Sequence, residues 1–242
     1  MIDLAQLLLL GSAAFIAATL AAVTGFGGAA VLLPVLIAVF GVRDAIPILT
    51  VAQLIGNGSR VWFNRGELAL PVIRWFALGA VPLALLGGVL FAQAPIPFLT
   101  RLVGLFLLLT VVWRHVRRGP PRRPGLRSFA LIGAVFSFLS ALVGSVGPLM
   151  APFFLAYGLV KGAYIGTEAL ATVIMHVTKL VAYGGTAVLT WATVGIGLAL
   201  GPIMVAGSFV GKRILERLPE RVFIWLIEGV LLVAGVAFLL GG

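Results

Sequence analysis

Two segments of the chain carry polar side chains at helical spacing within otherwise apolar sequence. Steps of three and four residues place the members of each set on one face of a helix. The first set is Thr50, Gln53, Asn57 and Arg60, and the second is Glu168, Thr172, His176 and Lys179. In each set a cation follows a neutral hydrogen-bonding residue by three positions. Amides, imidazoles and cations all donate hydrogen bonds, so the sets predict the binding of a small anion.

Polar and ionisable side chains inside a membrane-spanning segment are costly and usually face a protein interior or a transport pathway. Asn57 and His176 lie deep within their segments, which favours a pathway role for both. Arg60 and Lys179 lie closer to the segment ends, so their charged groups could instead extend to the membrane surface. That alternative stays open for the two cations.

A glycine-rich break precedes each polar set. The first break contains Gly25, Phe26, Gly27 and Gly28, and the second contains Gly144, Ser145 and Gly147. A short apolar segment follows each break, so its free N–H groups and the positive end of its helix dipole would form an anion site. Backbone that is not helical is tolerated within a membrane only where protein or a cavity covers it. Alternatively, the glycines only allow the helices to pack closely.

The predicted substrate-binding residues combine the two breaks with parts of the polar segments. They are Gly25, Phe26, Gly27, Gly28, Gln53, Asn57, Arg60, Gly144, Ser145, Gly147, Thr167, His176 and Lys179. Ionisable groups inside a membrane are also candidates for carrying protons. The predicted proton-coupling residues are Glu168, His176 and Glu228. For Glu228, an ion pair with a nearby Arg or Lys is an equal alternative.

The composition predicts an all-α polytopic membrane protein. Of 242 residues, 62% are hydrophobic and only 10% are charged. The chain has no cysteine, which excludes disulfides and thiolate metal sites, and two histidines are too few for a histidine-only metal site. We therefore expect no metal and no cofactor. The net charge of +10 comes from residues at segment ends, which favours topology signals and anionic lipid headgroups over nucleic acid.

We expect ten helical elements, five in each half of the chain. The second element of each half is about a dozen residues long, whereas a full membrane span needs about 20. It is therefore either a half-helix or one arm of a re-entrant hairpin. The expected elements are residues 4–23, 29–41, 45–63, 70–92, 98–114, 127–143, 148–158, 162–183, 190–211 and 221–240.

The two halves repeat one order of landmarks. Pro34 and Pro152 close the short apolar runs, and Gly41 and Gly158 end the second elements. The predicted organisation is a first repeat at 1–118, a basic, proline-rich linker at 119–126, and a second repeat at 127–242.

Charge predicts how the repeats lie in the membrane. Six arginines occur between Arg114 and Arg127, which makes this connection cytoplasmic by the positive-inside rule. On the same side we expect the loop with Arg60, Arg65 and Arg74 and the loop with Lys212, Arg213, Arg217 and Arg221. Both termini are then periplasmic or extracellular. The basic loop follows the third element in the first half but the fourth in the second, so the repeats are inverted.

Enzyme signatures are weak in this sequence. Ser145 and His176 permit an intramembrane serine hydrolase as a minor alternative, but the nucleophile-elbow pattern is absent. No P-loop or dinucleotide fingerprint occurs either. We therefore expect no enzymatic activity, and no ATP-driven pumping by this chain alone.

Together these residues resemble the TauE/SafE family of sulfite exporters. The resemblance covers the whole chain and rests on Gly25–Gly28 followed by Val31–Pro34, the second break ending at Pro152, Gly166–Thr167, and His176-x-x-Lys179. It implies a small bacterial inner-membrane protein, built as an inverted repeat, that moves sulfite, sulfoacetate or other organosulfonates. The thiosulfate branch of the family relies on cysteines, which this chain lacks. The second break also departs from the family pattern, because it is poorer in glycine and contains Ser145 and Pro148.

The predicted function is secondary transport, in the direction of export, of a sulfur-containing anion held between the two breaks at the membrane midplane. An inside-negative potential favours anion exit by about 2.3 kcal/mol per charge per 100 mV. Alternating access would come from the two repeats rocking about the anion. Expected partners are the small anion and membrane lipid, with proton coupling and homo-oligomerisation left open. The alternatives are a small-anion channel and an assembly subunit without transport of its own.

Overall fold

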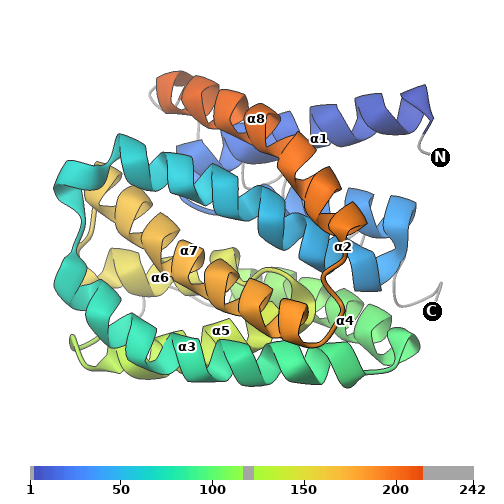
Figure 1. Ribbon diagram of the computed structural model, residues 1–242. Coiled ribbons are helices and arrows are strands. Elements are labelled where there is room, and N and C mark those ends of the chain that lie inside the picture. The colour runs from blue at the N-terminus through green and yellow to red at the C-terminus, as the bar shows by residue number, and fades with distance from the viewer. Residues whose placement is uncertain (1–2, 117–122, 215–242) are drawn as a thin grey trace.

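The computed structural model describes residues 3–116 and 123–214, and every regular element within these ranges is helical (Figure 1). The elements are α1 (Leu4–Thr24), α2 (Gly28–Phe63), η1 (Arg65–Glu67), α3 (Leu70–Gln93), α4 (Ile96–Val116), α5 (Ser128–Val143), α6 (Gly147–Tyr157), α7 (Lys161–Gly185) and α8 (Trp191–Ile214). The expected tenth element, Glu228 within it, and part of the expected linker lie outside the described residues.

Five helices in the described part of the chain are long and apolar enough to cross a membrane: α1, α2, α3, α7 and α8. Helices α5 and α6 and the first half of α4 are apolar but shorter. The predicted class, an all-α polytopic membrane protein, is confirmed. Helix α6 has 11 residues, too few to span a bilayer alone.

Helix α2 consists of two helical segments that meet at Gly41. The backbone of Gly41 is not helical (φ 75°, ψ 163°), and this conformation is open to glycine because it lacks a β-carbon. The predicted separation of two elements at this residue is confirmed. The second segment begins sooner than expected, because helical backbone resumes directly after Gly41.

The helices form three layers, and the outer layers pair helices from different halves of the chain. In Figure 1, α1 lies against α8 at the top, α3 lies against α5 at the bottom, and α2 and α7 lie between them. Helix α2 also contacts α8, and α7 contacts α3. The central layer is therefore made of the two helices that carry the polar sets.

Glycines bring the paired outer helices into backbone contact. A β-carbon added to Gly133 of α5 would lie 2.2 Å from the carbonyl oxygen of Phe76 in α3. One added to Gly207 of α8 would lie 2.5 Å from the carbonyl oxygen of Phe15 in α1. Lipid supplies no hydrophobic drive for association between helices, so close packing through small residues takes its place.

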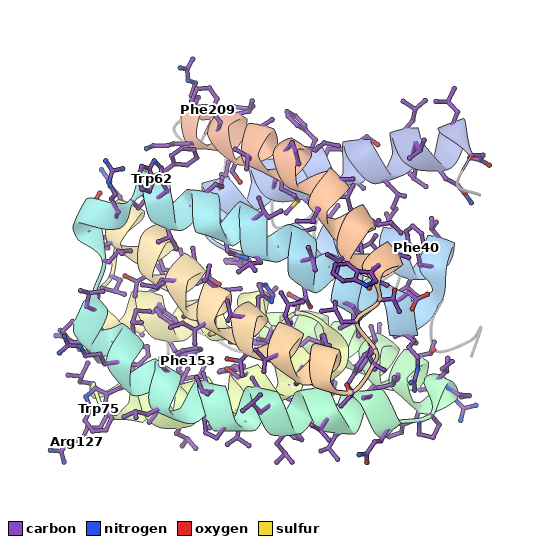
Figure 2. The ribbon with its side chains drawn as sticks, in the orientation of Figure 1. Phe40, Trp62, Trp75, Arg127, Phe153 and Phe209 are labelled. Carbon is purple, nitrogen blue, oxygen red and sulfur yellow. The ribbon has the colours of Figure 1, made fainter. Side chains whose placement is uncertain are left out.

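Aromatic and basic side chains gather at one end of the helices. Figure 2 shows Trp62, Trp75 and Arg127 at this end and Phe40 toward the other. The guanidinium of Arg65 lies 4.5 Å from the centre of the Trp62 ring, and that of Arg127 lies 5.9 Å from the Trp75 ring. Such clusters are typical of a membrane interface. That this end is cytoplasmic stays a prediction from charge.

Candidate functional site

The first glycine break turns the chain sharply between α1 and α2. Gly25 and Gly27 both have left-handed backbone, with φ of 80° and 96°. A β-carbon on Gly25 would also lie 2.5 Å from the ring of Tyr164 in α7, whose hydroxyl donates to the carbonyl oxygen of Thr24 at 3.1 Å. Both the backbone angle and the neighbouring ring therefore require glycine at position 25.

The second break turns the chain between α5 and α6, and it lies directly beside the first. Gly144 is left-handed with a φ of 86°. A β-carbon on Gly147 would lie 3.2 Å from the β-carbon of Phe26. The two breaks, distant in sequence, are thus in contact in the fold.

Both breaks and both polar sets border one small cavity of about 40 Å³. One water molecule needs roughly 10–15 Å³ of cavity volume. The space therefore suits a few waters or one small anion. The cavity is lined by Ala21, Gly25, Phe26, Gly27, Gly28, Ala29, Gln53, Asn57, Arg60, Ser140, Gly144, Ser145, Val146, Gly147, Glu168, Thr172, Met175 and His176.

Two helix N-termini adjoin this cavity. Helix α2 begins at Gly28 and α6 begins at Gly147, and both residues line the space. No side chain of the preceding residue, Gly27 or Val146, accepts a hydrogen bond from either N-terminus. The N-terminus of a helix carries partial positive charge, and its first N–H groups lack partners within the helix. In α6 few of these donors remain, because Pro148 has no N–H and the N–H groups of Leu149 and Met150 donate to the carbonyl oxygen of Val146. The arrangement can therefore bind an anion from two sides.

The buried side chain of Arg60 caps the C-terminus of α1. Its Nη1 donates to the carbonyl oxygens of Ala21, at 3.0 Å, and Gly25, at 2.9 Å. Its Nη2 donates to the Oδ1 atom of Asn57. Arg60 is only 5% exposed and lies within α2. Both the expectation that it lies in a loop and the alternative that it reaches the membrane surface are wrong, because carbonyl groups at the end of α1 bind it inside the fold.

Lys179 makes the corresponding contacts in the second half. Its Nζ lies 3.4 Å from the carbonyl oxygens of Ser140 and Gly144 and 3.2 Å from the Ser140 hydroxyl. Lys179 is fully buried, so the surface alternative is wrong for this cation as well. It closes the C-terminus of α5 and is absent from the cavity lining.

Glu168 is the carboxylate of the site. It is 2% exposed, and its Oε2 lies 3.7 Å from Nη1 of Arg60. Thr172 donates to its Oε1 at 3.2 Å. A β-carbon built on Gly147 would lie 4.0 Å from Oε1, so the carboxylate lies beside the start of α6.

Buried polar atoms without hydrogen-bond partners concentrate at the cavity. They include Nε2 of Gln53, Oε2 of Glu168 and Nδ1 of His176, and all three residues line the space. A buried polar group without a partner costs roughly 1–3 kcal/mol. A polar ligand in the cavity would supply the missing partners.

A family model described as "Sulfite exporter TauE/SafE" matches residues 10–238. The chain belongs to this family. Comparison with curated proteins and with solved structures gave no match. The TauE/SafE family is one of membrane transporters, which agrees with the expectation that this chain is not an enzyme.

Most of the predicted substrate-binding residues of this TauE/SafE chain lie around the cavity, and two do not. Lys179 lies behind the lining, as described above. The Thr167 hydroxyl accepts a hydrogen bond from the backbone N–H of Ala69 at 3.0 Å, which ties α7 to the start of α3. Of the proton-coupling candidates, Glu168 and His176 line the cavity. Within the described ranges, no cluster of three potential metal ligands occurs.

Several residues of the TauE/SafE site were not predicted from the sequence. Thr172 and Met175 line the cavity from α7, and Ser140 lines it from α5. Helical spacing already places Thr172 in the second polar set, although it is not among the predicted substrate-binding residues. Nothing local distinguishes Ser140 or Tyr164 from other residues of their helices, since their roles depend on contacts with distant segments.

Proposed function

We propose that the chain exports a small sulfur-containing anion, sulfite or an organosulfonate such as sulfoacetate, by secondary transport. The observation that carries this proposal is the cavity between the two glycine breaks, where two helix N-termini meet buried polar atoms without partners. An anion with several acceptor oxygens satisfies such donors from more than one side. Membership of the TauE/SafE family supports the sulfur-containing class of substrate.

The volume of the cavity favours the smallest member of that class. At about 40 Å³ it has room for a sulfite-sized ion. Sulfoacetate adds a carboxymethyl group, so its binding requires the side chains or helices around the cavity to move apart. We therefore expect sulfite to bind more tightly than sulfoacetate in the conformation described here.

Alternating access by two inverted repeats is part of the proposal. The equivalent contacts of Arg60 and Lys179 support a repeated architecture, because each cation caps the C-terminus of the first helix in its own half. The glycine breaks then lie on the boundary between the halves. Alternating access would open the cavity to one side of the membrane and then to the other.

Sulfite flux from liposomes containing the purified protein tests the proposal. We expect saturable efflux, accelerated by sulfite on the opposite side, as a carrier requires. Asn57→Ala and His176→Ala should each reduce sulfite affinity at least tenfold. Thr100→Ala is the matched control, because Thr100 bonds only within α4 and lies away from the cavity. Efflux that rises linearly with sulfite would favour the small-anion channel, and absence of flux would contradict both.

A further inference from the structure

We propose that Glu168 is a resident anion of the binding site, and that an incoming substrate anion binds together with one proton, which Glu168 takes up. The inference rests on the proposed function, because it concerns the same cavity. The inference goes beyond the proposed function by stating that Glu168 is protonated when the cavity binds its substrate.

The position of the carboxylate is the first argument. Oε1 lies beside Gly147 at the start of α6, and Oε2 lies 3.7 Å from Nη1 of Arg60. A helix N-terminus and a guanidinium are the two groups expected to attract a substrate anion here. The side chain of Glu168 therefore already occupies the position in which those two groups would bind an anion.

The charges around the cavity are the second argument. Among the lining residues, Arg60 of α2 is a cation and Glu168 of α7 is an anion, and His176 of α7 is titratable. Just outside the lining lie Lys179 and Tyr164 of α7, bonded to carbonyl groups of α5 and α1 respectively. With Arg60 and Glu168 both charged, the lining is neutral.

A further carboxylate, that of Glu67 in η1, lies against Gly162 at the start of α7. Glu67 is exposed and does not line the cavity. The charged side chains of the described residues that face Glu168 across the cavity are thus limited to Arg60.

A second negative charge in so small a space would repel an ionised Glu168 strongly, because water cannot screen the pair. Protonation of Glu168 removes the repulsion and frees Arg60 to bind the substrate. It also gives Oε2, which has no hydrogen-bond partner, an O–H that can donate to a substrate oxygen. The proton comes from the aqueous side to which the cavity is open, and no other bond is made or broken.

Coupling between anion binding and protonation of Glu168 has a consequence for transport. A dianion that moves with one proton carries a single net negative charge, so the inside-negative potential still favours its exit. A proton gradient that is acidic outside opposes that exit. Anion binding and proton binding must strengthen each other equally, since linkage between two ligands is reciprocal.

Calorimetry on the purified full chain tests this inference. Sulfite is titrated into wild type, Glu168→Gln and Glu67→Gln in two buffers of different ionisation enthalpy, which gives the protons taken up per bound anion. We expect wild type and Glu67→Gln to take up about one proton more than Glu168→Gln. The protonation of sulfite itself is the same in all three and cancels. Equal uptake in wild type and Glu168→Gln overturns the inference while leaving the anion site intact.

A second measurement uses wild type alone, in case Glu168→Gln fails to fold. Methanesulfonate keeps one charge at all working pH values, so any proton taken up on its binding belongs to the protein. Uptake of about one proton supports the inference, and binding with no uptake overturns it. If neither sulfite nor methanesulfonate binds to the wild type, the proposed function fails and this inference fails with it.

Discussion

Arg60 and Lys179 make the same pair of contacts, each with the carbonyl oxygens 39 and 35 residues before it. Each cation thereby neutralises the negative end of the first helix of its half. They differ in their relation to the cavity and to Glu168. Arg60 also lines the cavity and pairs with Glu168, whereas Lys179 does neither. At equivalent positions in the two halves, Arg60 therefore both caps a helix and lines the cavity, whereas Lys179 only caps a helix.

The single substitution Arg60→Ala should destabilise the protein more than the double substitution Arg60→Ala/Glu168→Ala does. Arg60→Ala leaves Glu168 buried without a cation, which costs about 3–5 kcal/mol in comparable buried pairs. The double variant Arg60→Ala/Glu168→Ala removes both charges and should recover part of that loss. Thermal unfolding of the four proteins in detergent measures the coupling. Strict additivity of the two single effects would show that the pair does not interact.

Lys179→Met should separate stability from binding. The variant loses the contacts at the end of α5, so the melting temperature should fall. Because Lys179 does not line the cavity, sulfite affinity should change by less than about threefold. His176→Ala should show the opposite pattern, with weak binding and a nearly unchanged melting temperature. A large loss of affinity in Lys179→Met would place its charge at the substrate after all.

Gly25→Ala should destabilise the first break. The left-handed backbone costs about 1–3 kcal/mol for a residue with a β-carbon, and the new methyl would meet the Tyr164 ring at 2.5 Å. Gly58→Ala is the matched control, because Gly58 lies within α2 with nothing closer than 4 Å to an added β-carbon. It should be neutral or slightly stabilising. Equal effects of the two substitutions on thermal unfolding would contradict the geometry of the break.

Single cysteines should report the predicted orientation in the membrane, because the chain has none of its own. Gly66→Cys and Gly185→Cys both place the thiol at an exposed position with no neighbouring atom within 4 Å. We expect an impermeant maleimide added to intact cells to label position 185 and not position 66. Labelling of both in lysed cells is the control for reactivity. The reverse pattern in intact cells would invert the proposed topology.

The sequence predicted the polar sets and the glycine breaks because both are local signals. Helical periodicity alone places Gln53, Asn57 and Arg60 on one face, and the structure finds all three at the cavity. The role of Lys179 could not be predicted in the same way. Whether a buried cation contacts a ligand or a helix end depends on which distant segment lies opposite, and that is decided by tertiary packing.

The sequence predicts where the first segment of α2 ends, but it does not predict the backbone conformation that follows. Gly41 was expected to close an element, and it does interrupt the helix. The immediate resumption of α2 was not expected, because one residue in an unusual conformation can kink a helix without a loop. The approach of Tyr164 to Gly25 shows the same limit, since the two residues are brought together only by the docking of α7.

The pairing of α1 with α8 and of α3 with α5 has a consequence for biogenesis. Each of these contacts joins a helix made early in translation to one made after the midpoint of the chain. The face of α1 that packs against Gly207 and Gly211 has no such partner until α8 has left the ribosome and entered the bilayer. Insertion of the early helices must therefore precede their assembly, and a nascent chain arrested at its middle would leave those faces open to lipid or to chaperones.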